Sequence, residues 1–122
     1  MGEKQTKKIL IADDDQLMTK ALTIRLVKAG FLVKNVLNGK EVLDSLANEQ
    51  FDLVILDLAM STSGFEVLEE LKKRSVQLPI IVYSALAQEG DLVKTLGAKE
   101  YFVKSKTRIE DVVASVEKLL GN

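Results

Sequence analysis

The chain has 122 residues, of which 47% are hydrophobic and 29% are charged, and its 17 lysines and arginines nearly balance its 18 aspartates and glutamates. This composition is typical of one folded domain, and the balanced charge lacks the basic excess of a general nucleic-acid binder. The chain has no cysteine and no histidine, which excludes disulfides, thiol nucleophiles, histidine bases and Cys or His metal ligands.

No targeting or membrane segment is evident. No apolar stretch approaches the roughly 20 residues of a membrane-spanning helix, and the apolar run at 9–12 is too short for the core of a secretory signal peptide. We therefore expect a cytoplasmic protein without a membrane partner. Because there is no repeat, low-complexity tract or linker, we expect a single domain over 1–122, with a core of about 8–120 and no output domain.

Short apolar runs alternate with segments of helical periodicity along the chain. The first helical segment places Leu17, Ala21, Leu22, Ile24, Leu26 and Val27 mostly on one face, and Gly30 follows its end. The pair Asn38-Gly39 is a turn signal. In chain order we predict a strand at 9–12, a helix at 16–29, a strand at 31–36, a helix at 40–48, a strand at 52–58, a helix at 64–74, a strand at 79–83, a helix at 89–96, a strand at 100–103 and a helix at 107–120.

Strict alternation of strands and helices predicts βαβ units and a parallel sheet. The runs LVIL and PIIV are continuously apolar, as in strands that are buried on both faces. The predicted fold is therefore α/β, a doubly wound five-stranded parallel sheet of flavodoxin-like strand order 2-1-3-4-5. Ligands of such sheets bind beyond the carboxyl ends of the strands, between the first and third strands.

Polar side chains follow the predicted strands at that edge. Three aspartates follow the first strand, and Asp15 among them is suited to cap the next helix. Asp57 ends the third strand, where an unpaired carboxylate would be costly to bury. Ser84 and Lys104 end the fourth and fifth strands, so acidic, hydroxyl and cationic groups should converge.

Clustered carboxylates repel one another and attract a hard divalent cation. We expect Mg2+ rather than Ca2+, because the chain offers few protein ligands, and zinc would prefer the nitrogen or sulfur ligands that are absent. Phosphoryl transfer mainly requires positioning and neutralisation of the phosphoryl oxygens. Lys104 and the Ser84 hydroxyl offer a cation and a donor for such oxygens.

At this point the sequence resembles the response-regulator receiver domain of two-component signalling. The resemblance extends from about residue 8 to about residue 120. It is carried by the segments ILIADDD, FDLVILDLAM, LPIIVYSA and GAKEYFVK and by the residues that follow Ser63.

The resemblance implies a role for each strand-end residue. It implies that Asp57 is the phosphorylation site and that Asp13 and Asp14 hold Mg2+, with Asp14 the more direct ligand. Asp57 and the backbone carbonyl of Ala59 would complete the protein's ligands. Ser84 and Lys104 would bind the phosphoryl group, and Tyr101 would be the aromatic switch residue that turns inward when Ser84 is drawn to the phosphate.

Two departures from the family pattern and two further positions carry expectations. Ser105 follows Lys104 in place of proline, so we expect either a trans bond with a shifted loop or a strained cis bond that costs about 2.5–4 kcal/mol. Ser61 replaces a proline after Met60, which should make that loop more mobile. The positions two residues after Asp57 and Ser84 are Ala59 and Leu86, which cannot hydrogen-bond an attacking water, so we expect slow loss of the phosphate.

The predicted function is a phosphoacceptor switch, not an enzyme in its own right. The phosphoryl donor would be a histidine kinase or a histidine phosphotransfer protein. A downstream protein or output domain would respond to the face formed by 89–96, 100–103 and 107–120, which could also join two copies in a weak dimer of an otherwise monomeric domain. Lys94, Lys99, Tyr101 and Lys106 are its expected exposed residues, and Leu17 and Met18 mark a second docking face.

Three alternatives stay open beside the switch. The same fold could act as an interaction domain without phosphorylation. Asp13 and Asp15 resemble the nucleophile motif of haloacid-dehalogenase phosphatases, but no second acidic pair follows Lys104 and there is no cap domain. A flavin site is disfavoured because the acidic loop after the first strand would repel the flavin phosphate. The sequence does not distinguish a free-standing domain from one cut out of a larger protein.

Overall fold

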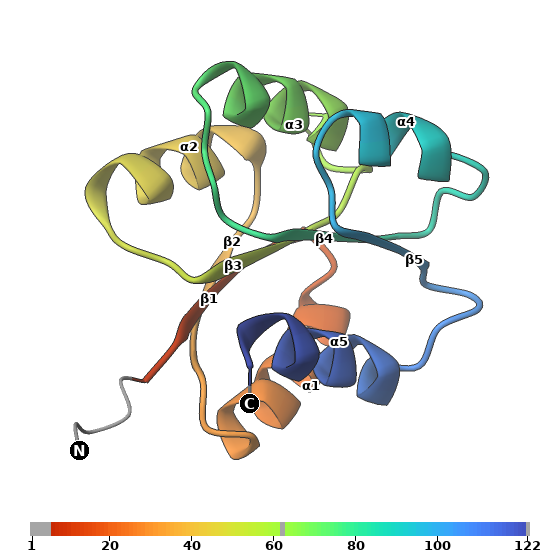
Figure 1. The fold of residues 1–122 in the computed structure, drawn as a ribbon. Helices are drawn as coiled ribbons and strands as arrows, with labels where there is room; N and C mark the ends of the chain where they lie inside the picture. The colour runs from red at the N-terminus through yellow and green to blue at the C-terminus, as the bar shows by residue number, and fades with distance from the viewer. Residues whose placement is uncertain (1–5, 62, 122) are drawn as a thin grey trace.

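The computed structural model describes residues 6–61 and 63–121, which form one parallel sheet covered by helices on both faces (Figure 1). The sheet order is β2-β1-β3-β4-β5, which confirms the predicted flavodoxin-like topology. In Figure 1, α2, α3 and α4 lie on one face, and α1 and α5 lie on the other. The elements are β1 Lys8–Ala12, α1 Gln16–Lys28, β2 Leu32–Val36, α2 Gly39–Asn48, β3 Leu53–Leu56, α3 Gly64–Lys73, β4 Ile80–Ser84, α4 Gly90–Thr95, β5 Glu100–Val103 and α5 Ile109–Leu120.

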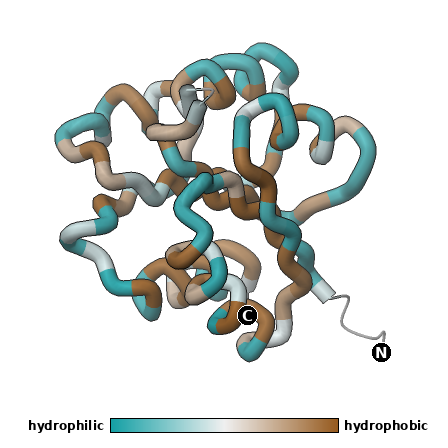
Figure 2. Tube along the Cα trace, turned by 180° about the vertical axis from the view of Figure 1, so that it is seen from behind, coloured by the Kyte–Doolittle hydropathy of each residue, from teal (hydrophilic) through white to brown (hydrophobic). Residues whose placement is uncertain are grey.

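The central strands are buried on both faces, as their continuous apolar runs predict. Every residue of β3 and β4 is buried, whereas the edge strands β2 and β5 are only partly covered. Figure 2 shows hydrophobic segments running through the middle of the molecule along these strands. Alternate side chains of the sheet therefore build two cores, one beneath α2, α3 and α4 and one beneath α1 and α5.

Several element ends differ from the expected ones. β3 ends at Leu56, so Asp57 lies just beyond the strand, whereas β4 includes Ser84 as its last residue. Asn38 and Gly39 do not form a separate turn: the Asn38 side chain caps α2 by accepting from the Glu41 N–H at 2.9 Å, and Gly39 is the first helical residue. The Asn-Gly pair was ambiguous because asparagine favours both turns and helix N-caps.

Helix α1 departs most from its prediction. Leu22 and Leu26 are buried, but Leu17 is 84% exposed, and Ile24 and Val27 are also exposed. The prediction that these apolar residues share one face was wrong. Residues in a helix advance by about 100° each, so six apolar positions between 17 and 27 cannot all face the sheet. The helix therefore leaves an apolar stripe in contact with solvent.

None of the helices among the described residues combines the length and the apolar character needed to cross a membrane.

Candidate functional site

The carboxyl ends of β1 and β3 bring two aspartates to the same point of the sheet edge. The two strands pair in parallel with Ala12 opposite Leu56, and the Asp57 N–H donates to the Ala12 carbonyl at 2.9 Å. Asp13 and Asp57 each follow one of these paired residues. The register of two adjacent strands thus places their carboxylates side by side, as expected from the sequence.

Asp13, Asp14 and Asp57 form one acidic cluster. Each offers a carboxylate oxygen, and these three atoms lie within 4.8 Å of one another. Asp13 and Asp57 are both only 4% exposed, whereas Asp14 faces solvent. Backbone donors hold the two buried carboxylates: the Asp15 N–H donates to Asp13 Oδ1 at 2.9 Å, and the Ala59 N–H donates to Asp57 Oδ1 at 3.2 Å.

Lys104 supplies the positive charge of the cluster. Its Nζ lies 2.7 Å from Asp13 Oδ2 and 3.6 Å from Asp57 Oδ2, so its closer partner is Asp13. Its own backbone N–H donates to the Ser84 carbonyl at 2.8 Å, which ties the end of β5 to the end of β4. The cation lies between the two buried carboxylates and offsets the cost of burying them.

The charges of the cluster are coupled. Burial raises the pKa of the Asp13 carboxyl, and the hydrogen bond from Lys104 only partly opposes this rise. Burial lowers the pKa of the Lys104 ammonium, but its hydrogen bond to Asp13 and the attraction of Asp13 and Asp57 outweigh burial and leave that pKa raised. The lysine is therefore a permanent cation at neutral pH.

Ser84 and Tyr101 both contact the backbone of Leu86. The fully buried Ser84 hydroxyl accepts a hydrogen bond from the Leu86 N–H at 3.2 Å. The partly buried Tyr101 hydroxyl donates to the Leu86 carbonyl, and its ring lies near Gly90 at the start of α4. Of the expected exposed residues on this face, Lys94, Lys99 and Lys106 are exposed, whereas Tyr101 is half-buried.

The neighbouring loops settle two sequence expectations. No cis peptide bond occurs within residues 6–61 or 63–121, so the Lys104–Ser105 bond is trans and the strained cis alternative was wrong. The loop shift that was expected with a trans bond stays a prediction. Asp15 caps α1 as predicted, because its side chain accepts from the Met18 N–H at 3.1 Å.

The donor set fits magnesium. Oxygens about 2.1 Å from a Mg2+ ion lie about 3.0 Å apart when adjacent and about 4.2 Å apart when opposite, which three oxygens already within 4.8 Å can reach by small side-chain rotations. All three donors are hard carboxylate oxygens, and backbone N–H groups orient the carboxylates of Asp13 and Asp57. Exposed Asp14 leaves one side open to the water ligands that Mg2+ retains.

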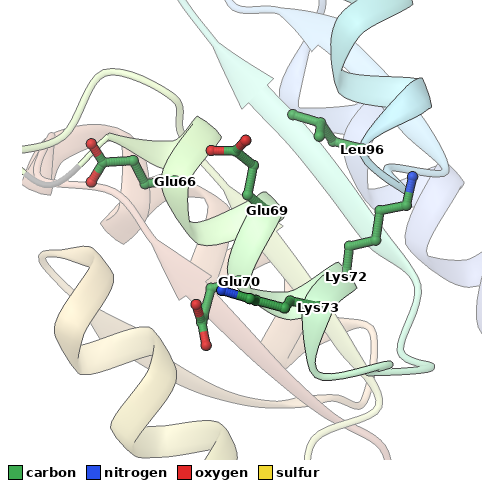
Figure 3. A pocket seen from close by; sticks show the side chains of 6 residues that line it. All are labelled: Glu66, Glu69, Glu70, Lys72, Lys73 and Leu96. Carbon is green, nitrogen blue, oxygen red and sulfur yellow. The ribbon is translucent and has the colours of Figure 1, made fainter.

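A surface hollow lies elsewhere, along α3 and the end of α4. Figure 3 shows its lining side chains, of which the acidic ones are Glu66, Glu69 and Glu70 and the others are Lys72, Lys73 and Leu96. Lys72 donates to the Thr95 carbonyl at 2.9 Å across this hollow. None of the strand-end residues lines it, so the hollow is separate from the acidic cluster.

Two residues near the cluster were missed by sequence reasoning. A Cβ added to Gly64 would lie 2.5 Å from the Asp57 carbonyl oxygen, so α3 begins in direct contact with the backbone of the acidic cluster. Tyr83 is buried and donates its hydroxyl to the Thr107 carbonyl. The signal for Tyr83 was available, because a tyrosine in a buried strand needs a partner for its hydroxyl.

Comparisons with known proteins identify relatives of the chain. The family model described as the response regulator receiver domain matches residues 9–117. The probable transcriptional regulator ycf27 of Porphyridium aerugineum is 35% identical over 127 residues, which cover 97% of this chain and 52% of that protein. The transcriptional regulatory protein PhoP of Bacillus subtilis, named for alkaline phosphatase synthesis, is 33% identical over 101 residues, covering 80% of this chain and 42% of that protein.

Solved structures share the fold. The response regulator protein TrrA of Thermotoga maritima, solved in complex with Mg(2+)-BeF, is 34% identical with a TM-score of 0.83, covering 93% of this chain and 99% of that chain. The Francisella response regulator 1452 receiver domain has a TM-score of 0.90 at 24% identity, covers 95% of this chain and 98% of that chain, and supports the fold alone. The chain spans about half the length of the curated relatives it matches.

Proposed function

The chain belongs to the response regulator receiver domain family of two-component signalling, and from this membership we propose that it is a regulatory switch that accepts a phosphoryl group on Asp57. The observation that carries the proposal is the arrangement at the sheet edge. Three carboxylates lie within 4.8 Å, and the Lys104 ammonium lies 3.6 Å from Asp57.

In the proposed reaction, a carboxylate oxygen of Asp57 attacks the phosphorus of a phosphohistidine on a histidine kinase or phosphotransfer protein. The new P–O bond forms as the P–N bond breaks, and the leaving imidazole takes up a proton. Asp13, Asp14, Asp57 and the Ala59 carbonyl would hold Mg2+, which when bound neutralises charge on the carboxylates and on the phosphoryl oxygens.

Lys104 and Ser84 would receive the phosphoryl oxygens. Lys104 is held beside Asp57 by its hydrogen bond to Asp13, so its cation lies close to the acceptor before the reaction. The Ser84 hydroxyl accepts from Leu86, and its own proton is available to a phosphoryl oxygen. Both groups add charge-assisted hydrogen bonds, which are stronger than neutral ones.

Leu86 would carry the change from the site to the surface. The Leu86 N–H donates to the Ser84 hydroxyl, and the Leu86 carbonyl accepts from the Tyr101 hydroxyl. A rotation of Ser84 toward the phosphate would therefore move the Leu86 backbone to which Tyr101 is bonded. Tyr101 belongs to β5 and lies near the start of α4. The face formed by α4, β5 and α5 would then differ between the two states and control a partner, an attached output domain or a weak dimer.

The phosphorylated state should be long-lived. Ala59 and Leu86 are exposed and apolar at the positions from which a polar side chain could orient an attacking water. We expect a half-life of the phosphate in the purified protein well beyond seconds. A half-life of seconds would contradict this expectation, and Ala59→Asn with Leu86→Glu should shorten it.

The phosphoryl donor would dock over α1. Leu17, the second residue of α1 after the Asp15 cap, is 84% exposed, and an exposed apolar side chain that follows the Asp13–Asp15 loop so closely in the chain suits a partner helix. The relatives are named as transcriptional regulators of about twice this length. We propose that residues 1–122 form the receiver unit of such a system and that the response is expressed through protein contacts rather than through nucleic-acid binding by this domain.

The direct test is the intact mass after incubation with acetyl phosphate and Mg2+. Wild type and the control Asp44→Ala, an exposed aspartate on α2, should each gain one phosphoryl group, and Asp57→Ala should gain none. Loss of the covalent phosphate in Asp13→Asn but not in Asp57→Ala would instead favour the phosphatase alternative. No gain in wild type would favour an interaction domain that works without phosphorylation.

A further inference from the structure

Tyr83 lies directly before Ser84 on β4, and its side chain points into the core beneath α1 and α5. It is 2% exposed and packs in the apolar cluster that includes Val112 and Val116 of α5. At the end of the ring, the hydroxyl donates to the Thr107 carbonyl at 3.2 Å. The side chain thus joins a central strand to the segment 104–108 between β5 and α5.

The ends of the segment 104–108 are held by backbone hydrogen bonds, because the Lys104 N–H donates to the Ser84 carbonyl and the Arg108 carbonyl accepts from the Asp111 and Val112 N–H groups. The middle of the segment has fewer anchors. Within it, the Lys106 N–H donates to the Val103 carbonyl in a local turn, and the N-cap residue Arg108 makes no side-chain capping bond to α5. Among residues 6–61 and 63–121, the Tyr83 hydroxyl is the one side-chain group that hydrogen-bonds the backbone of 105–108. Residue 105 is a serine, so no proline ring restricts the backbone at this position, and its peptide bond with Lys104 is trans. The Tyr83 hydroxyl is therefore the side-chain group that ties the middle of this segment to β4.

The same side chain also contacts Lys104 itself. The Lys104 Nζ lies 6.0 Å from the centre of the Tyr83 ring, at the outer limit of a cation–π contact. Because β5 ends at Val103, Lys104 is the first residue of the segment 104–108. Its Nζ lies 2.7 Å from Asp13 Oδ2. The Tyr83 side chain thus lies next to the Lys104 ammonium and is also hydrogen-bonded to the backbone that follows Lys104.

We propose that Tyr83 is a positioning residue that holds Lys104 in place for the phosphoryl group. This inference rests on the proposed function, because Lys104 needs a fixed place only if it meets phosphoryl oxygens. Tyr83 does not touch the acidic cluster through its hydroxyl, so its effect on phosphorylation passes through Lys104 and the segment 104–108. A tyrosine that merely fills the core would support the fold equally well whether or not Lys104 is present.

The test is a double-mutant cycle of Tyr83→Phe and Lys104→Ala, read as the rate of phosphorylation by acetyl phosphate with Mg2+. Tyr83→Phe removes only the hydroxyl and keeps the ring in the core. We expect it to lower the rate about three- to tenfold, the range for loss of one hydrogen bond. In the Lys104→Ala background it should cause no further loss, because the group that it positions is gone.

An equal loss in both backgrounds, or no loss in the wild-type background, would overturn the positioning role while leaving the proposed function intact. A wild-type protein that takes up no phosphoryl group would overturn the proposed function, and this role with it.

Amide hydrogen exchange in the unphosphorylated, magnesium-free protein gives a second readout. The Lys106 amide should exchange faster in Tyr83→Phe than in wild type, and amides of α1 should not change. The matched control is Tyr101→Phe, which removes the other tyrosine hydroxyl and its bond to Leu86 and should leave Lys106 unchanged. Unchanged Lys106 exchange in Tyr83→Phe, or an equal increase in Tyr101→Phe, would also overturn the role.

Discussion

Replacing Gly64 with alanine should destabilise the protein by forcing a methyl group against the backbone of the acidic cluster. The added Cβ would lie 2.5 Å from the Asp57 carbonyl oxygen and 2.7 Å from the Leu58 Cα, whereas ordinary contacts begin at 3.4 Å. Both neighbours are backbone atoms. The strand end cannot retreat easily, because the Asp57 N–H is bonded to Ala12 and the Gly64 N–H to Leu58.

The expected cost follows from this overlap. Inserting a methyl group into a tightly packed position typically costs about 1–3 kcal/mol, and the higher helix propensity of alanine returns less than about 1 kcal/mol. We therefore expect the free energy of unfolding in urea to fall by about 1–2 kcal/mol, out of the 5–15 kcal/mol typical of a domain. Because the overlap involves Asp57, phosphorylation by acetyl phosphate should also slow.

The matched control is Gly90→Ala. Gly90 also begins a helix, α4, but its added Cβ would find its nearest neighbour, an atom of the Tyr101 ring, at an ordinary 3.4 Å. This variant should change the unfolding free energy by less than about 0.5 kcal/mol or stabilise the protein slightly. If the free energies of unfolding of the two variants differ by less than about 0.5 kcal/mol, the close approach of α3 to Asp57 is not a tight constraint.

Three further outcomes test other parts of the structure. Mg2+ at 100 times its dissociation constant should raise the unfolding free energy of wild type and of the control Asp44→Ala by about 2.7 kcal/mol. The measurement is thermal unfolding with and without EDTA. Equal stabilisation of Asp14→Ala by Mg2+ would argue against the metal site. Burial raises the pKa of the Tyr83 phenol above its ordinary value of 10.0, more than Lys104 lowers it, so this group's contribution to stability is full below pH 10.0 and is lost as the pH rises through the folded-state pKa. The free energy of unfolding in urea should therefore fall more steeply above pH 10.0 for wild type than for Tyr83→Phe. Parallel plots of this free energy against pH would show that the folded and unfolded states do not differ in the pKa of the phenol. Asp15→Ala should lower the unfolding free energy by about 1 kcal/mol through loss of the α1 cap, and a change below about 0.3 kcal/mol would mean that the cap is replaced by solvent.

The sequence by itself determined the order of the elements and the edge at which the polar residues meet. The continuous apolar runs of β3 and β4 are typical of strands covered on both faces, and their alternation with helical segments predicts that the strands are parallel. Parallel strands end at the same edge, so Asp13, Asp57 and Lys104 were brought together by their places after three strands, without knowledge of any side-chain contact.

Tertiary structure decided which side chains touch. The closer approach of Lys104 to Asp13 than to Asp57, the exposure of Leu17 and the bond from Tyr83 to Thr107 all depend on packing between segments far apart in the chain. The overlap at Gly64 depends on how closely α3 packs against the end of β3. Periodicity and spacing describe one segment at a time, and they specify the direction of a helix face only when the apolar residues fill a single stripe. In α1 they fill more than one, so only the packing of the helix against the sheet selected the buried residues.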